Sequence, residues 1–161
     1  MFDRGQYIIY GGNGVCKIED IVVRDTSILG QRETYVIRLA SGLTAYVPTD
    51  SPVYMRPLVS EEEALSVIHE FPDIQPRPIP ATNSKSLADQ YRAIIAKHDL
   101  REMIILYKSL KLKLRQAAEA GKKPGAMDDR FSAQAIEAVL DEVCTVLSRD
   151  KEELRKELLP E

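Results

Sequence analysis

The sequence predicts an α+β protein in which a small β barrel or sheet is followed by an all-α helical bundle. Three observations lead to this expectation. Short strand-like runs separated by turn residues extend to Arg56, helical apolar spacing begins after Ser60, and four prolines lie between Phe71 and Asn83. The chain has 161 residues, of which 44% are apolar and 29% charged, so it has a globular composition and room for two small domains.

The first part of the chain contains five strand-like segments, each rich in β-branched and aromatic residues and each ending at turn residues. They lie at residues 7–10, 15–24, 33–39, 43–48 and 53–56. Glycines at 11, 12 and 14 separate the first two segments, and Ser41 with Gly42 closes a tight hairpin. We therefore expect a small β domain over residues 1–58.

Helical signals begin with the capping box of Ser60 and Glu63, which predicts a short helix. The prolines at 72, 76, 78 and 80 then exclude a helix interior, so residues 59–82 are interpreted as a short helix and an extended connector between domains. Amphipathic segments follow at about 84–98, 99–120 and 131–147, with a short one from Asp150. They predict a helical domain over residues 83–161.

Several classes of protein are not indicated. The apolar runs are far shorter than the ~20 residues that a bilayer span needs, and the N-terminus lacks the pattern of a signal peptide. We therefore expect a cytoplasmic protein that does not associate with a membrane. Cys16 and Cys144 are interpreted as buried thiols, and neither His69 nor His98 has a cysteine or carboxylate at the short spacing of a metal site. No catalytic motif is visible, so we expect no enzyme activity, no metal and no cofactor.

A basic stripe lies in the second long helical segment. The stretch contains a single acidic residue, and its basic residues are Lys108, Lys111, Lys113, Arg115, Lys122 and Lys123. Lys108, Lys111 and Arg115 are three and four residues apart and therefore share one helix face. This face is either an ordinary solvated surface or a contact for DNA phosphates. Because the net charge of the chain is −3, any contact with DNA must be local.

Three further side chains are candidates for binding. Leu87 lies on an apolar stripe, which predicts core packing, although its place in the first helical turn would also suit a minor-groove wedge. Arg24 ends the second strand and Tyr46 lies in the fourth, and both are residue types that often anchor protein interfaces.

The opening FDRGQYIIYGGNGV, followed by ETYVIRL, LTAYVP and MRPL, resembles the CarD/CdnL family of bacterial RNA polymerase-binding transcription factors over nearly the whole chain. The resemblance implies a Tudor-like β domain, shared with transcription-repair coupling factors, that docks on the polymerase β subunit partly by strand addition. Arg24 and Tyr46 fall at contacting positions, and Ile28 is a further candidate. Members commonly carry an arginine where Tyr46 stands.

The resemblance also implies that the helical domain contacts promoter DNA without sequence specificity and modulates the stability of the open promoter complex. Well-known members insert a tryptophan at the edge of the melted DNA. This chain has no tryptophan, and Leu87 occupies the matching position. The resulting candidates for DNA contact are Leu87, Arg92, Lys108, Lys111 and Arg115.

Two alternatives to this function remain. The helical domain could bind another protein instead of DNA, an interpretation that Asp89 and Gln90 favour because members often carry basic residues there. An enzyme would need a polar pocket that no motif indicates. We expect a monomer or a weak dimer, because a small β domain leaves sheet edges that could pair with polymerase or with another copy.

Overall fold

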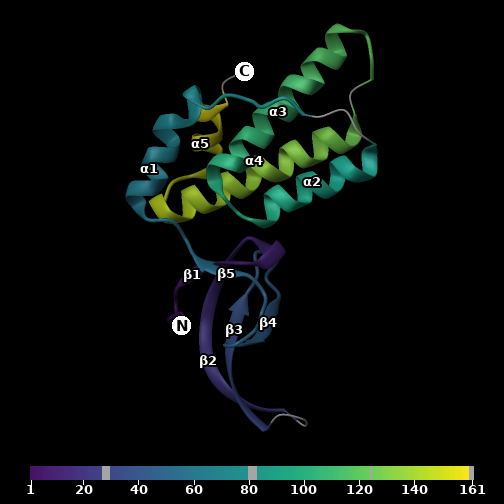
Figure 1. Cartoon of the computed structure of the whole chain (residues 1–161). Helices are drawn as coiled ribbons and strands as arrows, with labels where there is room; N and C mark the ends of the chain where they lie inside the picture. The colour runs from purple at the N-terminus through teal and green to yellow at the C-terminus, as the bar shows by residue number, and fades with distance from the viewer. Residues whose placement is uncertain (27–29, 80–82, 124, 160–161) are drawn as a thin grey trace. The chain divides into compact units, whose positions relative to one another are not determined.

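The computed structural model describes residues 1–26, 30–79, 83–123 and 125–159, and it confirms the predicted α+β class. The chain divides into two compact units, Met1–Leu58 and Val59–Glu161. We call them the sheet unit and the helical unit and describe each by itself (Figure 1). No helix in the described part of the chain is both long and apolar enough to cross a membrane.

The described residues of the sheet unit form five antiparallel strands. They are β1 (Tyr7–Tyr10), β2 (Val15–Thr26), β3 (Gly30–Arg38), β4 (Thr44–Pro48) and β5 (Met55–Pro57). Their order in the sheet is β4-β3-β2-β1-β5. None of the pairings between described residues joins β4 to β5, so β4 and β5 are the two edges of an open sheet.

The inner face of the sheet carries the core of this unit, which consists of Ile8, Cys16, Ile18, Tyr35, Ile37 and Val47. A register shift between Ile18 and Asp20 interrupts the pairing of β2 with β3. A bulge of this kind exchanges the two faces for all later residues of the strand. Cys16 and Ile18 therefore point inward before the bulge, and Ile21 packs against the same core after it. This explains why the alternation of apolar residues in this strand is irregular.

The described residues of the helical unit form five α-helices. They are α1 (Glu61–Glu70), α2 (Ser84–Ala96), α3 (Leu100–Glu119), α4 (Ala126–Leu147) and α5 (Lys151–Leu158). Four helices begin at a side-chain cap, from Ser60, Asn83, Asp99 and Asp150, with cap distances of 2.8–3.1 Å to the third following backbone nitrogen. The cap predicted at Ser60 and the helix start predicted at Asp150 are therefore confirmed.

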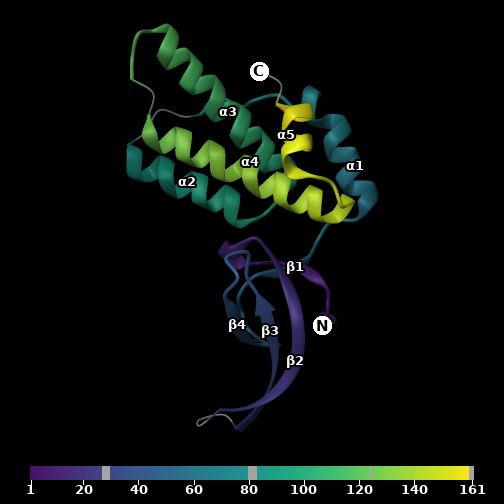
Figure 2. The same cartoon turned by 180° about the vertical axis from the view of Figure 1, so that it is seen from behind.

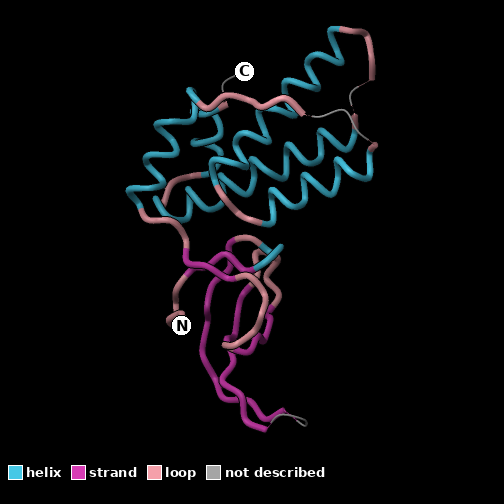
Figure 3. The backbone as a smooth tube through the Cα atoms, viewed as in Figure 1, coloured by secondary structure: helices cyan, strands magenta, loops and turns pink. Residues whose placement is uncertain are grey.

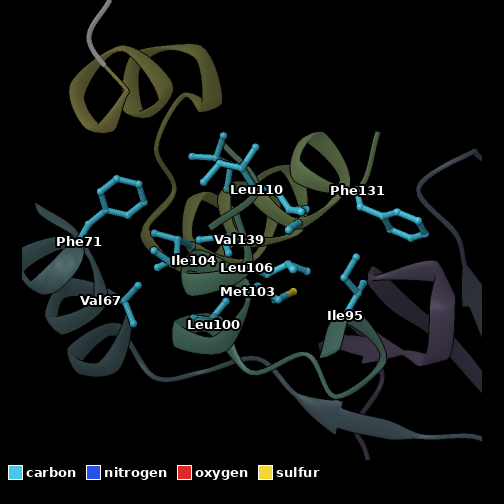
Figure 4. Close-up of a cluster of buried hydrophobic side chains, with 14 of the residues drawn as sticks. Val67, Phe71, Ile95, Leu100, Met103, Ile104, Leu106, Leu110, Phe131 and Val139 are labelled. Atoms are coloured by element: carbon cyan, nitrogen blue, oxygen red, sulfur yellow. The ribbon is translucent and has the colours of Figure 1, made fainter. Parts of the chain in front are cut away.

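One apolar core joins the helices of this unit. Figures 1 and 2 show α4 lying alongside both α2 and α3, and contacts between these helices agree with the views. Figure 4 shows Val67 and Phe71 at one side of the core, Leu100, Met103, Ile104, Leu106, Leu110 and Val139 in the middle, and Ile95 and Phe131 at the other side. Because several amphipathic helices share this core, none has to be stable alone.

The proline-rich segment differs from the expected joint between domains. The boundary between the two units lies between Leu58 and Val59 in the sequence, so the segment that follows α1 belongs to the helical unit. It is pinned to α3, because the backbone N–H of Arg77 donates to Ser109 Oγ (2.8 Å) and the Arg77 guanidinium forms two hydrogen bonds with Glu102 (2.8 and 3.0 Å). Its extended conformation was expected from the prolines, but its attachment to α3 was not.

Candidate partner-binding surfaces

Arg24 and Tyr46 meet on the outer face of the sheet. The bulge in β2 places Arg24 on this face, because it reverses the direction of the even-numbered residues that follow it. Tyr46 lies on β4, and β3 runs between the two strands. The guanidinium carbon of Arg24 lies 4.3 Å from the centre of the Tyr46 ring, which is a cation–π contact. The Tyr46 side chain remains 53% exposed and is available to a partner.

A shallow hollow adjoins this pair. It is lined by Arg24, Asp25, Arg32, Thr34, Tyr46 and Pro48. Thr34 is only 4% exposed, although it points toward the outer face. Arg32 at the rim donates two hydrogen bonds to the Asp50 carboxylate (3.0 and 2.8 Å), which fixes its position. The hollow thus combines an exposed aromatic ring with two guanidinium groups.

The outer edge of β4 offers unpaired backbone groups. Leu39 N–H donates to the Leu43 carbonyl, and Thr49 N–H donates to the Glu33 carbonyl. Because hydrogen-bonded positions alternate along an antiparallel pair, the backbone groups of Thr44 and Tyr46 point away from β3. Pro48 has the same orientation and lacks an N–H, so it costs the sheet no internal hydrogen bond. A partner strand could therefore pair with this edge beside the Tyr46 ring.

The similarity of the chain to a known family lies in the sheet unit. Residues 2–59 match the family model of the CarD-like/TRCF RID domain. The matched segment contains all five strands, Arg24 and Tyr46, and it ends where the helical unit begins. A comparison with curated proteins finds no match to the chain. Ile28, the third residue that we expected at this interface, lies outside the described residues.

Leu87 of the helical unit is buried rather than projecting. Only 7% of it is exposed, and it belongs to the core with Ala88, Tyr91 and Ile95 of the same helix. The expectation of core packing is confirmed, and this burial gives the wedge expectation no support. The reason is that the first turn of α2 packs against the bundle instead of extending beyond it.

Lys108 is half-buried, and its ammonium group is bonded within the helical unit. Its Nζ donates to the carbonyls of Phe71 and Ile74, the latter at 2.8 Å, and lies 4.6 Å from the centre of the Phe71 ring. Burial lowers the pKa of Lys108, and the charge of Asp73 only partly opposes this shift. The ammonium group of Lys108 thus holds the chain segment that leaves α1, which gives its assignment to DNA no support.

Arg92, Lys111 and Arg115, the remaining candidates for DNA contact, are exposed. Arg92 pairs with Asp89 (3.3 Å) one turn away, and its guanidinium carbon lies 5.6 Å from the centre of the Phe131 ring. Lys111 and Arg115 lie on another helix, α3, and neither has an ion-pair partner among the described residues. The structure brings together Lys108, Lys111 and Arg115, as their spacing predicted, but not Arg92 or Leu87 with them.

Lys113 of the basic stripe has a partner in the core. Its Nζ lies 3.1 Å from the Asp128 carboxylate, which also accepts a hydrogen bond from the Tyr91 hydroxyl (3.2 Å). Burial raises the pKa of Tyr91, and the charge and hydrogen bond of Asp128 raise it further. This group joins α2, α3 and α4, so we assign it to stability.

Sequence reasoning missed a groove beside the basic stripe. It lies among the end of α1, the proline-rich segment, the second half of α3 and the end of α5. Its lining residues are Phe71, Pro72, Pro76, Tyr107, Lys108, Lys111, Leu112, Arg115, Glu157, Leu158 and Leu159. The signals in the sequence were an apolar Leu112 between basic residues and the Leu158-Leu159 pair, but nothing in the sequence placed them together.

Proposed function

We propose that this chain is a transcription regulator that docks on the β subunit of RNA polymerase through its sheet unit. Support comes from the match of residues 2–59 to the CarD-like/TRCF RID family, whose domain interacts with this subunit. The observation that carries the proposal is the Arg24–Tyr46 contact beside the free edge of β4, within the matched segment. The role is binding and not catalysis, and we expect it in the cytoplasm.

Docking would use two features that lie next to each other. A strand of polymerase would pair with the outward backbone groups of Thr44 and Tyr46, which gives affinity independent of sequence. The Tyr46 ring and the Arg24 guanidinium would then contact the partner's side chains, and both residue types are enriched where interfaces gain most of their binding energy. The proposal includes a Tudor-like fold for the sheet unit and a CdnL-type identity for the chain.

The proposal is tested by measuring the affinity of the full chain for the isolated β-subunit lobe. We expect Tyr46→Ala to raise the Kd about 30-fold, because an interface anchor of this kind contributes about 2 kcal/mol. Tyr7→Ala is the matched control. Tyr7 is also an exposed ring on the outer face, 46% exposed and 5.7 Å from Lys17 Nζ, but it lies on β1, away from the β4 edge. Equal effects of the two substitutions would contradict the proposed surface.

Strand addition has a separate test. Thr44→Pro removes an N–H that points away from β3, so it spares the internal pairing while it weakens a pairing at the edge. We expect weaker binding to the lobe with an unchanged thermal midpoint. Unchanged binding would exclude strand addition at this edge and would mean that side chains alone make the contact.

A second candidate function is the modulation of open promoter complexes through non-specific DNA contact by the helical unit. The observation that favours it is the exposure of Arg92, Lys111 and Arg115. If Lys111 contacts a phosphate, Lys111→Ala should reduce the slope of log Kd against log salt concentration for DNA by ~1. An unchanged slope would exclude Lys111 from a DNA-binding face.

A further inference from the structure

The groove of the helical unit has the size of a binding site. Its volume is about 680 Å³, within the range of ~300–1,000 Å³ that is usual for ligand-binding clefts. One wall is the second half of α3, and the opposite walls are the proline-rich segment and the end of α5. In Figure 3, as in Figure 2, the loop that follows α1 passes the end of α5, as this lining requires.

The floor of the groove is apolar. Leu112 is 36% exposed, and Leu158 and Leu159 are only partly buried against the core of the unit. The rings of Phe71 and Tyr107 and two prolines add to this surface. Apolar surface of this kind gains about 25 cal/mol for each Å² that a partner covers, so a ligand with apolar side chains is favoured.

The rim of the groove on α3 is positively charged. Lys111 and Arg115 are one helical turn apart, about 6 Å along the axis, and have no ion-pair partner among the described residues. Glu157 is the acidic residue of the lining, and Arg149 Nη2 lies 2.7 Å from its carboxylate. The negative charge of the groove is therefore already compensated, whereas the positive charge of its rim is not.

The base of the groove is held in place before any ligand binds. Lys108 joins α3 to the carbonyls of Phe71 and Ile74, and Pro72 and Pro76 restrict the backbone beside them. A preformed groove reduces the conformational entropy that binding must overcome.

We infer that this groove binds an acidic amphipathic helix of a partner protein, with its apolar side chains on the leucines and its carboxylates on Lys111 and Arg115. The spacing of the two cations matches acidic residues four positions apart on a helix. DNA fits less well, because a phosphate backbone has no apolar groups for the leucine floor. The inference does not depend on docking to polymerase.

The test is a fluorescence anisotropy titration of the full chain against a labelled synthetic helix of about 16 residues, with leucines on one face and glutamates beside them. A second peptide carries glutamine at each glutamate, and a short DNA duplex is the third probe. We expect the acidic peptide to bind about tenfold more tightly than its glutamine version, because two carboxylate–cation pairs at a rim contribute ~1 kcal/mol or more.

Variants connect the binding to the groove. K111E/R115E should weaken the acidic peptide about tenfold, and Leu112→Ser should weaken both peptides. The control is K85E/K97E, which makes the same charge change at exposed positions on or beside α2 and should leave binding nearly unchanged. The inference is overturned if the acidic peptide does not bind, if the two double variants behave alike, or if only the duplex binds in a way that requires Lys111 and Arg115.

Discussion

Replacement of Lys108 by methionine should destabilise the helical unit, although lysines on helix surfaces usually contribute little. Methionine keeps most of the apolar stem and removes only the ammonium group. That group donates to two backbone carbonyls, of Phe71 and Ile74, and lies over the Phe71 ring. The substitution leaves these acceptors without their charged donor in a part-buried site.

The expected loss is about 2 kcal/mol. A hydrogen bond from a charged donor contributes ~1.5–3 kcal/mol, and a cation over an aromatic ring adds ~0.5–1 kcal/mol. The energetic cost of burying the ammonium, which also lowers its pKa, offsets part of this sum. Because the site is only partly buried, water replaces some of the lost hydrogen bonding.

Urea unfolding followed by circular dichroism at the helix band measures this effect, since all five α-helices belong to the helical unit. A loss of about 2 kcal/mol should lower the midpoint by roughly 1 M urea. Lys111→Met is the matched control, because Lys111 is one turn along the same helix, is exposed, and lies farther from its ring, with Nζ 5.8 Å from the centre of Tyr107; it should change stability by less than ~0.5 kcal/mol. Equal midpoints for the two variants would refute the role that we assign to Lys108.

Three further predictions concern the stability of the helical unit. Leu87→Ala should lower the free energy of unfolding, measured in urea, by about 2–4 kcal/mol because Leu87 is a core residue, whereas Leu65→Ala, at a position 57% exposed, should lower it little. Equal losses of stability would contradict the burial of Leu87. Ser60→Ala should cost ~1 kcal/mol by loss of the cap of α1, with Ser66→Ala as the control, and a thermal scan showing no difference would exclude the cap. Burial alone would raise the pKa of Glu137, but hydrogen bonds from Lys151 and Arg155 of α5 lower it below the ordinary 4.5. The stability that Glu137 contributes is therefore present above pH 4.5 and is lost as the pH falls through the lowered pKa, so between about pH 7 and about pH 3 Glu137→Gln should lose less stability than the unmodified chain.

Much of the fold was predictable because local signals agreed with the global arrangement. Strand runs bounded by turn residues, the caps at Ser60 and Asp150, and the apolar stripe of Leu87 and Tyr91 each depend on residues close in sequence. The irregular alternation in β2 could not be interpreted in advance, because a bulge becomes visible only through its pairing with β3.

The candidate sites were less predictable, since they depend on contacts between distant segments. Helical spacing correctly placed Lys108 beside Lys111, but only the return of the proline-rich segment along α3 explains why Lys108 is half-buried and Lys111 exposed. In the same way, the spacing of the basic residues did not show that Lys113 would meet Asp128. The ends of α1 and α5 complete the groove from segments more than 80 residues apart.

Docking on polymerase by the sheet unit is the central proposal, and charge reversal at Arg24 is its sharpest test. The affinity of the full chain for the polymerase β-subunit lobe should be measured with Arg24→Glu and with Lys17→Glu, since each residue is a cation next to an exposed tyrosine ring on the same face. We expect Arg24→Glu to abolish binding and Lys17→Glu to preserve it. Binding that survives Arg24→Glu, or the absence of binding by the unmodified folded chain, would contradict docking through this surface.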